Sequence, residues 1–527
     1  MRRFHSYGPV DLRFHIAVER RDLVERCVEQ LVNIPEEGGH YFTIWGPRQT
    51  GKTWVMRRGI EEIRARYGDR FAIGALSMQG ILADDDGEEV FFRSVPSLFR
   101  EGFGFDVKAP VDWDGWRALF ERQGGAFDRP LILLIDEFDS LPAAIIDRLV
   151  SGFRKMYLAR DAYWLHGLAL VGVRAVLGID SPRGSPFNVQ RSLHIPNLTQ
   201  AEVAAMFDQY RTESGQTVEP GVVDSVYTET RGQPGLVGWF GELLTEKYNP
   251  GSGQPITGQH WERTYMLACR VEPNNTVLNL SRKAKGPYRA QVMALFGNPD
   301  VPFSFEQDWC NYLYTNGILD FQESTTSTGV PTTVCRFSCP FVQLRLYEAF
   351  SGDMAPRAVA LPLEPLDMLA DVFTATGIDA GALTGRYKGY LGRVRAAGKD
   401  PFQGEQRRSD LGLREAVGHF HLYAWLREAV GWRCGVSPEF PTGNGKVDLL
   451  LQWEGHRAVI EVKSFRDAAE LVSARRQAAR YARGEGLAAA ALAVFVPSID
   501  EAVLEALSGS EVVDGVRVTT VAIGWVP

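Results

Sequence analysis

The sequence lacks an apolar run long enough to cross a membrane. The longest uncharged apolar stretch, residues 486–499, is rich in alanine and shorter than the roughly 20 residues that a spanning helix needs. The first residues, MRRFHSYGPVDLRF, are basic, but no apolar core of a secretion signal follows them. These absences argue against a membrane-embedded or secreted protein, and they predict a cytoplasmic protein with no membrane partner.

Cysteine is scarce and scattered. The 527 residues include six cysteines, at positions 27, 269, 310, 335, 339 and 434. This is no disulfide framework, and it suits a reducing compartment. Cys335 and Cys339 form a lone C-x₃-C with no second pair, so two half-buried strand cysteines are a better interpretation than a zinc site. The sequence also contains no internal repeat and no low-complexity tract.

An excess of positive charge is absent too. The chain has 57 Lys and Arg against 65 Asp and Glu, a net charge of −8, so any nucleic-acid surface must be local. With 45% hydrophobic and 23% charged residues, the composition is that of a globular protein. The length predicts about three or four domains.

Residues 41–55, YFTIWGPRQTGKTWV, contain the phosphate-loop pattern G-x-x-x-x-G-K-[ST]. The β-branched and aromatic residues 41–45 predict a buried strand, and the residues from Thr53 onward have helical periodicity. A strand, a glycine-rich turn and a helix aim backbone N–H groups at phosphate oxygens. The predicted nucleotide-binding residues are Gly46, Pro47, Arg48, Gln49, Thr50, Gly51, Lys52 and Thr53.

Two of these side chains have specific expected roles. Lys52 would reach the β- and γ-phosphates of ATP, where its positive charge also serves catalysis. The Thr53 hydroxyl would be a ligand of Mg²⁺. The alternative is a chance match in a glycine-rich loop, but the strand before it and the helix after it favour a nucleotide site.

A second signal is LILLIDEFD at residues 131–139. Five apolar residues predict a strand buried on both faces, and carboxylates follow at its carboxyl end, where ligands bind in parallel α/β sheets. Asp136 would hold Mg²⁺ through water, and Glu137 would polarise the attacking water as a general base. The alternative is a core strand followed by a helix-capping acid, an interpretation that fits Asp139 in particular.

Another apolar strand, residues 168–174, ends in Arg174. This position suits a sensor of the γ-phosphate, and a surface arginine is an equal alternative. Arg154, Lys155 and Arg160 precede this strand and are candidates for an arginine finger supplied to a neighbouring copy, as in a homo-oligomer. The sequence does not choose among them.

The segments GPRQTGKT, LILLIDEFDSL, LVGVRAV, SPFNVQRSLHIPNLTQAEV and TRGQPGLVGWFGELL resemble the AAA-like ATPase domains of prokaryotes, which are related to the STAND and archaeal-type ATPases. The resemblance covers about residues 1–250. It implies an α/β fold with a P-loop NTPase core at 1–196, whose parallel sheet has helices on both faces, and a helical lid at 197–250. Arg231 departs from the commoner Gly or Thr of the lid turn, so the resemblance only suggests a sensor role for it.

A winged-helix domain is predicted for residues 251–355, after a Gly- and Pro-rich linker at 250–260. Two short helices and two strands around a Ser/Thr/Gly turn give this pattern. FSCPFVQLRLYEAF, residues 337–350, resembles the segment that follows the wing in the same ATPase family. The proposed second helix is net acidic, which favours a packing role over DNA-groove binding.

Residues 356–408 are predicted to be a basic helical linker. Seven Lys and Arg side chains from Arg386 to Arg408 are interleaved with Tyr387 and Tyr390. Such a helix can follow a phosphate backbone, but a solvated face is the commoner explanation of a charge run.

The last third of the sequence contains an acidic hairpin. Asp448 opens an apolar strand, and after a short turn a second strand carries Glu461-Val-Lys463. The two-residue period of a strand puts Glu461 and Lys463 on one face, where Asp448 of the adjoining strand can meet them. Two carboxylates can hold Mg²⁺, and the lysine can stabilise charge or orient a water molecule.

This pattern resembles the PD-(D/E)XK nuclease fold over residues 409–527, a restriction-endonuclease-like α/β domain. The resemblance implies that Glu415, Asp448 and Glu461 are metal ligands and that Lys463 is catalytic. It also implies that Gln477, the first residue of a Q-x₃-Y motif in the helix predicted for 468–483, supports the site. Val447 stands at the family's nominal proline, a variable position. His419 and His421 are two residues apart on one helix, so they are poor joint ligands.

Two functional hypotheses follow. The first is an ATP-hydrolysing protein coupled to Mg²⁺-dependent cleavage of DNA through the C-terminal half, in defence or in mobile-element maintenance. The second is an ATP-switched DNA-binding or signalling protein whose nuclease-like domain is an inactive scaffold. The sequence leaves the choice between DNA and RNA open.

Overall fold

The computed structural model describes residues 1–6, 8, 10–81, 87–172, 192–297, 301–325, 329–354, 369–398, 402, 411–430, 434–439 and 448–525. The chain forms two compact units. The first comprises Met1–Thr276 with Thr315–Gly317, and the second comprises Val277–Tyr314 with Ile318–Pro527.

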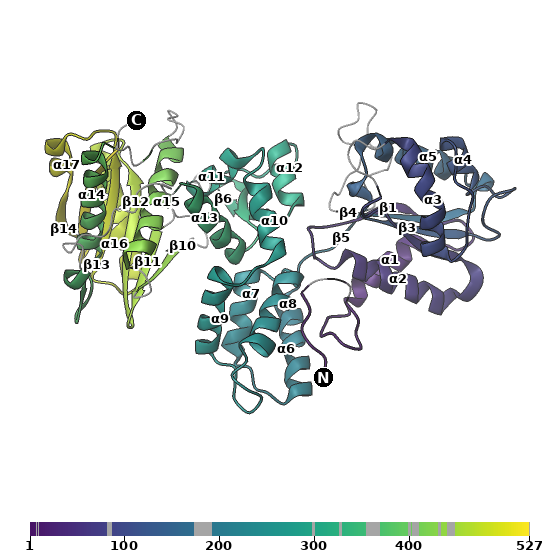
Figure 1. Cartoon of the computed structure of the whole chain (residues 1–527), viewed down its shortest axis with the longest axis horizontal. Helices are drawn as coiled ribbons and strands as arrows, with labels where there is room; N and C mark the ends of the chain where they lie inside the picture. Colours follow the sequence, from purple (N-terminus) through teal and green to yellow (C-terminus); the bar gives the residue numbers. More distant parts are fainter. Residues whose placement is uncertain are drawn as a thin grey trace. The chain divides into compact units, whose positions relative to one another are not determined.

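Five strands form the sheet of the first unit, in the order β2-β3-β4-β1-β5 (Figure 1). They are β1 Tyr41–Trp45, β2 Ala72–Ser77, β3 Leu131–Asp136, β4 Leu165–Gly172 and β5 Ser192–His194. Each pair of neighbours is parallel. The central strands are buried on both faces, which explains their nearly unbroken apolar sequences. The predicted parallel sheet is confirmed.

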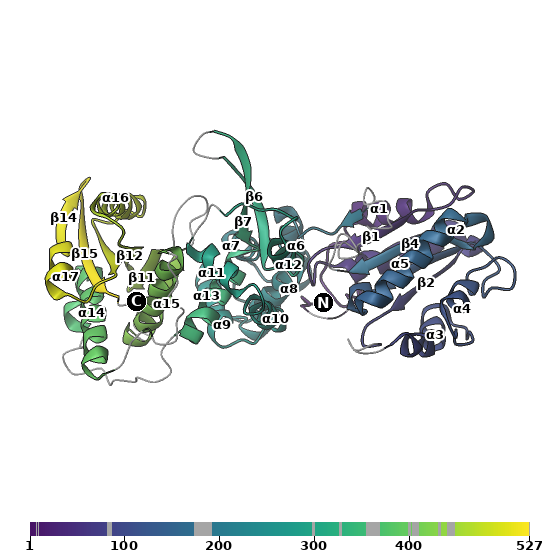
Figure 2. The ribbon, with the colours of Figure 1, turned by 90° about the horizontal axis from the view of Figure 1, so that it is seen from above.

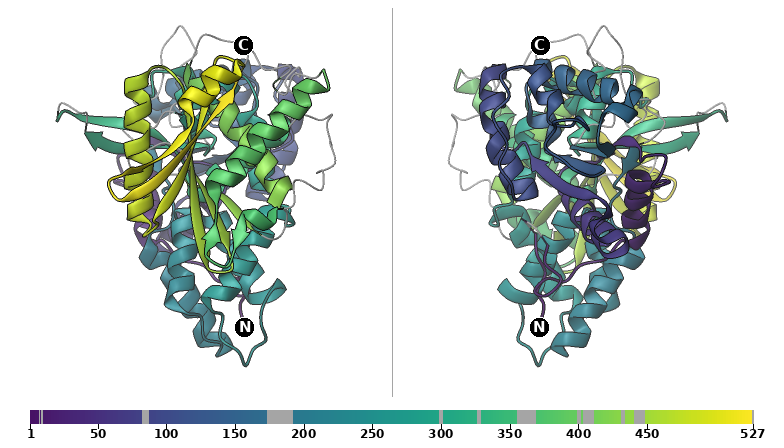
Figure 3. Two further views of the ribbon diagram at one scale, coloured as in Figure 1. Left: turned by 90° about the vertical axis from the view of Figure 1, so that its left-hand side faces the viewer. Right: turned by 90° about the vertical axis from the view of Figure 1, so that its right-hand side faces the viewer.

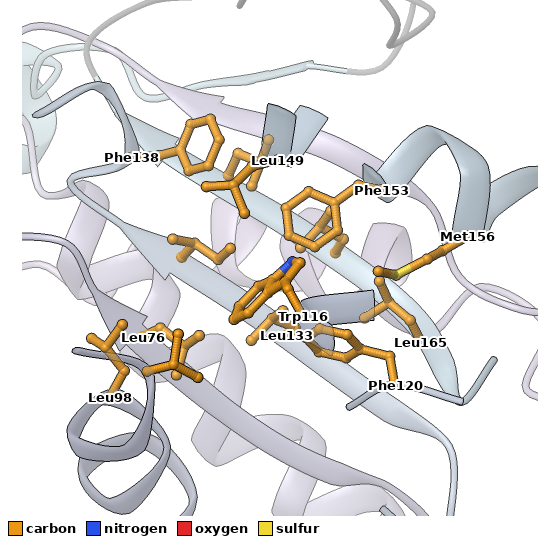
Figure 4. Close-up of a cluster of buried hydrophobic side chains, with 14 of the residues drawn as sticks. Leu76, Leu98, Trp116, Phe120, Leu133, Phe138, Leu149, Phe153, Met156 and Leu165 are labelled. Atoms are coloured by element: carbon orange, nitrogen blue, oxygen red, sulfur yellow. The ribbon is translucent and has the colours of Figure 1, made fainter. Parts of the chain in front are cut away.

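Helices cover both faces of this sheet. The helices are α1 Arg21–Val32 and α2 Lys52–Tyr67 on one face, and α3 Glu88–Phe103, α4 Trp113–Ala118 and α5 Ala143–Leu158 on the other. Ile132 belongs to the core beneath α1 and α2, whereas Leu133 belongs to the core beneath α3 to α5, as the alternation of a strand requires. Figure 4 shows Leu133 among Trp116, Phe120 and Phe153 in the second core.

A helical region completes the first unit. Its helices are α6 Gln200–Ser214, α7 Pro220–Thr230, α8 Pro234–Glu242 with a following π-helical turn Leu243–Lys247, and α9 Gly258–Arg270. Thr199 and Glu202 form a capping box that starts α6. The N-terminal segment packs on these helices, since Phe4 contacts Phe207 and Ser6 donates two hydrogen bonds to Glu242.

The second unit begins with helices and a hairpin. Its elements are α10 Asn275–Ala284, which starts at the unit boundary, α11 Arg289–Gly297, α12 Asp308–Thr315, β6 Leu319–Thr325, β7 Pro331–Phe337 and α13 Pro340–Met354. β6 and β7 are antiparallel and extend away from the helices (Figure 2). Pro302 forms an isolated bridge to Val334 of β7. A winged-helix domain over residues 251–355 stays a prediction.

A six-stranded sheet with the order β10-β11-β12-β13-β15-β14 follows (Figure 3). Its strands are β10 Gly435–Glu439, β11 Asp448–Trp453, β12 His456–Ser464, β13 Ala489–Val496, β14 Gly509–Val513 and β15 Val516–Gly524. The accompanying elements are β8 Phe373–Thr374, β9 Gly377–Ile378, α14 Ala380–Ala396, α15 Leu411–Val430, α16 Ala468–Gly484 and α17 Glu501–Leu507.

The two faces of this sheet carry different helices. Leu492 and Val494 of β13 belong to the core beneath α16. Phe495, which points to the opposite face, lies so close to Gly418 of α15 that a Cβ atom there would be 2.7 Å from its ring. α16 and α15 therefore sandwich the sheet.

Helix α14 lies in the segment expected to be a basic helical linker, for which the sequence leaves two alternatives, a helix that follows a phosphate backbone and a solvated face. Tyr387 is completely buried, and its hydroxyl is 2.8 Å from Nδ1 of His421. Arg386 pairs with Asp371, and Lys388 pairs with Glu501. α14 packs on the sheet, so Tyr387 is a core residue and cannot stack on a nucleic-acid base.

Within the described ranges, no helix combines the length and the apolar character that crossing a membrane would need.

We expect Leu133→Ala to lower the free energy of unfolding by about 2 to 5 kcal/mol, because it deletes a completely buried side chain from a central strand. Val111→Ala is the control, since Val111 is 88% exposed and such surface changes stay within about 0.5 kcal/mol. Thermal and urea unfolding would measure both. Equal effects of the two substitutions would contradict the described core.

Candidate nucleotide site and acidic hairpin

The phosphate loop connects β1 to α2. Gly46 has φ 157°, and a Cβ atom there would lie 2.8 Å from the Ile195 carbonyl oxygen, so a larger residue would collide with backbone. Gln49 has φ 61°, an unusual conformation for a residue with a side chain. α2 begins at Lys52, so the free N–H groups of its first turn face the loop.

Lys52 lies across this loop. Its Nζ donates hydrogen bonds to the carbonyl oxygens of Gly46, at 2.8 Å, and Pro47, at 2.7 Å. Burial lowers the pKa of Lys52 to about 8, although nearby Asp139, Glu137 and Asp136 favour its charged form. The ammonium group is therefore held by two neutral carbonyl groups, which phosphate oxygens could replace with stronger charged partners.

Thr53 and Asp136, which belong to the two motifs singled out in the sequence, are in direct contact. The Thr53 hydroxyl donates a hydrogen bond of 3.0 Å to Oδ2 of Asp136, although 83 positions separate them in the chain. Thr53 is in the first turn of α2, and Asp136 is the last residue of β3. The pair offers two adjacent oxygen atoms, which is the ligand type that Mg²⁺ prefers.

Glu137 follows Asp136 in a left-handed backbone conformation, with φ 54°. Its backbone N–H donates a hydrogen bond of 3.0 Å to Asp136 Oδ1. Burial raises the pKa of Glu137, and the negative charges of Asp136 and Asp139 raise it further. Such strain and a raised carboxyl pKa are typical of functional sites, and a raised pKa makes the carboxylate a better base.

Arg20, which sequence reasoning missed, ties the phosphate loop to the start of the helical region. Its guanidinium group donates to the carbonyl oxygens of Thr50 (3.1 Å), Pro196 (2.6 Å) and Asn197 (3.0 Å). Nε lies 3.5 Å from Glu202, and the side chain is 5% exposed. The sequence signal was only an arginine at the start of an amphipathic helix.

Two further residues contact the phosphate loop, one in the helical region and one in the segment that follows it. Gln233 Nε2 donates to the Arg48 carbonyl oxygen at 3.1 Å, and Gln49 Oε1 accepts a hydrogen bond of 2.6 Å from the Thr276 hydroxyl. A Cβ atom on Gly235 would lie 2.1 Å from Gln49 Oε1, so a larger residue there would displace the Gln49 side chain. Gln233 and Gly235 flank Pro234, which starts α8.

Other predicted residues have different outcomes. Arg174 lies outside the described residues. Arg160 donates to the Gly39 carbonyl oxygen at 2.6 Å and lies over the ring of Tyr157, so internal contacts hold this arginine-finger candidate. Arg154 and Lys155 are exposed on α5, and Arg231 is exposed in a left-handed turn at the end of α7.

In the second unit, β11 and β12 form the predicted hairpin. Asp448 is directly opposite Glu461 in the antiparallel register. Glu461 is completely buried, and its Oε1 lies 2.5 Å from Nζ of Lys463, which is also buried. The side chains of Asp448 and Glu415 lie outside the described part of the structure, so their metal-binding roles stay predictions.

Glu461 and Lys463 lie on the same face of the sheet, and the helix that covers this face can be identified. Glu461 is level with Leu492, and Lys463 with Val494, in the parallel pairing of β12 with β13. Leu492 and Val494 lie beneath α16, so Glu461 and Lys463 are on the α16 face of the sheet. Gln477 is a half-buried residue of α16.

Helix α15, which contains Glu415, covers the other face. Gly418 packs against Phe495, which is level with the last residue of β12, so the part of α15 around Gly418 lies near the carboxyl end of that strand. His419 contacts the Tyr347 hydroxyl, whereas His421 contacts Tyr387. The two histidines thus have separate partners, which agrees with their predicted unsuitability as joint ligands.

Among the side chains that the structure describes, no three His, Cys, Asp or Glu residues are grouped so that they could hold a metal ion. The Glu461 carboxylate and the residue opposite it, Asp448, are nevertheless of the oxygen-ligand type that suits Mg²⁺. The residues at both candidate sites therefore fit this ion in donor chemistry.

No protein-family profile and no curated protein matches this chain. Among solved structures, it is similar to a Walker-type ATPase of Pyrococcus abyssi, with 14% identity, a TM-score of 0.44, and coverage of 64% of this chain and 99% of that one. It is also similar to the Orc1 protein of Aeropyrum pernix in complex with DNA (15% identity, TM-score 0.33, 63% and 92% covered). A third similar structure is the Holliday-junction branch-migration motor RuvB of Thermotoga maritima (15%, 0.33, 60% and 92%).

These likenesses are too distant to decide a function. The parallel sheet itself, with a phosphate loop after β1 and Asp136 at the end of β3, fits a P-loop NTPase core.

We expect Arg20→Ala to destabilise the first unit by about 1 to 3 kcal/mol. The substitution removes a buried guanidinium group that donates hydrogen bonds to three backbone carbonyl groups. Arg21→Ala is the matched control, since that side chain is 84% exposed. Thermal unfolding of both variants would test this. A melting temperature of Arg20→Ala equal to that of Arg21→Ala would count against the described role.

Proposed function

We propose that this protein binds and hydrolyses ATP with Mg²⁺, and that it couples the nucleotide cycle to Mg²⁺-dependent cleavage of DNA. The observation that carries the first part is the hydrogen bond between Thr53 and Asp136, because it joins the phosphate loop to the acidic end of β3. Two motifs distant in sequence thereby form one site.

The residues of this site have different roles in the proposed reaction. The N–H groups at the start of α2 and the ammonium of Lys52 bind the phosphates, and Glu137 accepts a proton from the attacking water. When bound at Thr53 and Asp136, Mg²⁺ supplies charge neutralisation of the phosphates. Arg20 and Gln233 hold the carbonyl groups of the loop, which keeps its N–H groups aimed inward.

The proposed cleavage rests on the acidic hairpin. The order α15, β10, β11, β12, α16, β13, with β12 parallel to β13, supports the resemblance to the nuclease fold. Asp448 is level with Glu461, and Lys463 lies beside Glu461 on the same face. The carboxylates would hold the metal ion, and Lys463 would stabilise charge on the phosphodiester or orient the water.

A second candidate function is an ATP-switched DNA-binding or signalling protein without cleavage. One observation favours it: Glu461 is completely buried and its carboxylate contacts Lys463. An ion pair of this kind also suits a structural scaffold, since a buried charge needs a partner. Only the first candidate function predicts Mg²⁺-dependent cleavage of DNA, which can be measured.

ATP hydrolysis depends on Lys52 in this proposal. Lys52→Ala should abolish turnover, because the charge that contacts the phosphates is lost, whereas Arg57→Ala, an exposed arginine on the same helix, should hydrolyse ATP normally. Glu137→Gln should bind ATP but turn it over at least about a hundredfold more slowly. Phosphate release and nucleotide binding would measure these effects. Normal turnover of Lys52→Ala would place hydrolysis elsewhere.

DNA cleavage depends on Asp448 and Lys463. With plasmid DNA, Mg²⁺ or Mn²⁺ and ATP, the wild type and the control Glu505→Ala, an exposed residue of α17, should cut. Asp448→Asn and Lys463→Ala should not cut, because they remove a metal ligand and the stabilising charge. Thermal unfolding must accompany the assay, since Lys463 lies beside a buried carboxylate. Absence of metal-dependent cutting by the wild type would favour the second candidate function.

A further inference from the structure

Helix α16 presents a basic face that the proposed reaction does not use. Its 17 residues include four arginines, at 475, 476, 480 and 483, and one acid, Glu470. Arg476, Arg480 and Arg483 are exposed. Arg483 lies 3.5 Å from Asp514, but Arg476 and Arg480 form no ion pair or hydrogen bond with any residue that the structure describes. On a chain with a net charge of −8, this is a local concentration of positive charge.

We propose that this face of α16, with Arg476 and Arg480 at its centre, binds the phosphate backbone of DNA and leads it to the acidic hairpin. The proposal rests on the proposed nuclease function, because it assigns the surface that delivers the substrate of that site.

The helical geometry places both arginines on the outer side of α16. The opposite side contacts the sheet through Leu471, Ala474, Ala478 and Ala482, which are buried. At 100° per residue, Arg480 lies about opposite the centre of that buried side, and Arg476 lies one turn before it. Residues four apart are separated by about 6 Å along a helix, so two guanidinium groups can meet phosphates one or two nucleotides apart.

The two flanks of α16 lie over different strands of the sheet. On one flank, Arg475 Nε donates a hydrogen bond of 3.1 Å to Thr520 of β15 and lies 3.3 Å from Glu511 of β14. Gln477 is two residues further, about 200° around the helix, so it lies on the other flank. In the sheet order, β12 is on the opposite side of β13 from β15 and β14. The Gln477 flank therefore faces the strand of Glu461 and Lys463.

From the outer side of α16 toward β12, the polar side chains therefore follow one another in a fixed order. Arg480 is outermost, Gln477 is its neighbour three residues back, and the buried pair Glu461–Lys463 lies on the sheet beyond that flank. A phosphate backbone that contacts Arg476 and Arg480 passes beside Gln477 on its way to the hairpin. Basic outer residues supply affinity without sequence preference, because phosphates are common to every sequence.

The alternative anionic partner, a membrane surface, fits less well. A helix that lies in a membrane interface inserts a continuous apolar face among the lipids. The apolar face of α16 is already buried against β13 and β15, where Ala478 and Leu492 belong to one core. What α16 offers outward is charge rather than apolar surface.

The test measures DNA binding by the full chain without metal or nucleotide, so that no cleavage is required. Fluorescence anisotropy with labelled duplexes and single strands of about 20 nucleotides would be recorded between about 50 and 200 mM salt. Arg476→Gln/Arg480→Gln should weaken binding at least tenfold near 0.1 M salt, and it should lower the slope of log K against log salt by nearly two for duplex DNA, at about 0.9 per lost phosphate contact. Arg476→Lys/Arg480→Lys should keep the wild-type slope, because the charges remain.

Arg57→Gln/Arg93→Gln, two exposed arginines of the first unit, is the control for net charge and should bind DNA as the wild type does. An unchanged affinity and slope of the α16 glutamine variant would overturn the proposal, as would an equal loss in the control. If the α16 glutamine variant lost binding to vesicles that contain phosphatidylserine but still bound DNA, the proposal would be overturned in favour of a membrane surface as the partner. Intact, arginine-dependent DNA binding by a wild type that cuts no DNA would leave this surface in place and reject only the cleavage.

Discussion

The hydrogen bond between Thr53 and Asp136 is the contact on which the candidate nucleotide site depends. It can form only if α2 starts directly after β1 and if β3 ends level with that start, with β4 lying between the two strands. The apolar cores on both faces of the sheet hold the strands in this order. A single bond of about 1 kcal/mol cannot create such an arrangement, so it reports the packing of the whole core.

The phosphate loop is also in contact with parts of the first unit outside the sheet. The carbonyl groups of Arg48 and Thr50 accept hydrogen bonds from Gln233 and Arg20, and Gln49 contacts Thr276, the residue at which the first unit ends. The loop backbone is thus restrained from the helical region as well as from the sheet. Any rearrangement of the loop around phosphates changes these restraints directly.

Local signals made the centre of the first unit predictable. The phosphate loop, the strand 131–136 and the helix that follows Thr53 each combine a strong motif with the right periodicity, and the structure has all three. The contacts of Arg20 and Gln233 were not predictable, because they are made to backbone carbonyl groups, which leave no pattern in a sequence, and most of them join residues more than 170 positions apart. The packing of helix α14 was not foreseen, because the buried Tyr387 stands in a run dominated by charged residues.

The acidic hairpin was predictable for a similar reason. A turn, Glu454-Gly455, between two apolar runs fixes the register, and the register places Asp448 opposite Glu461. The complete burial of Glu461 beside Lys463 was not foreseen, because a sequence shows alternation but not the depth at which a strand lies. The edge strands β10 and β14 were missed, since short edge segments resemble loops in composition, and the interior strand β15 was missed as well.

The strand order of the second sheet also constrains how this half of the protein is made. β15 comes after every other strand of the sheet along the chain, yet it pairs with β13 on one side and with β14 on the other. During synthesis, β14 has no neighbour and the edge of β13 stays open until β15 has left the ribosome. An open apolar edge can recruit another chain, so the emerging C-terminal half has a late, aggregation-sensitive stage that chaperones would have to cover.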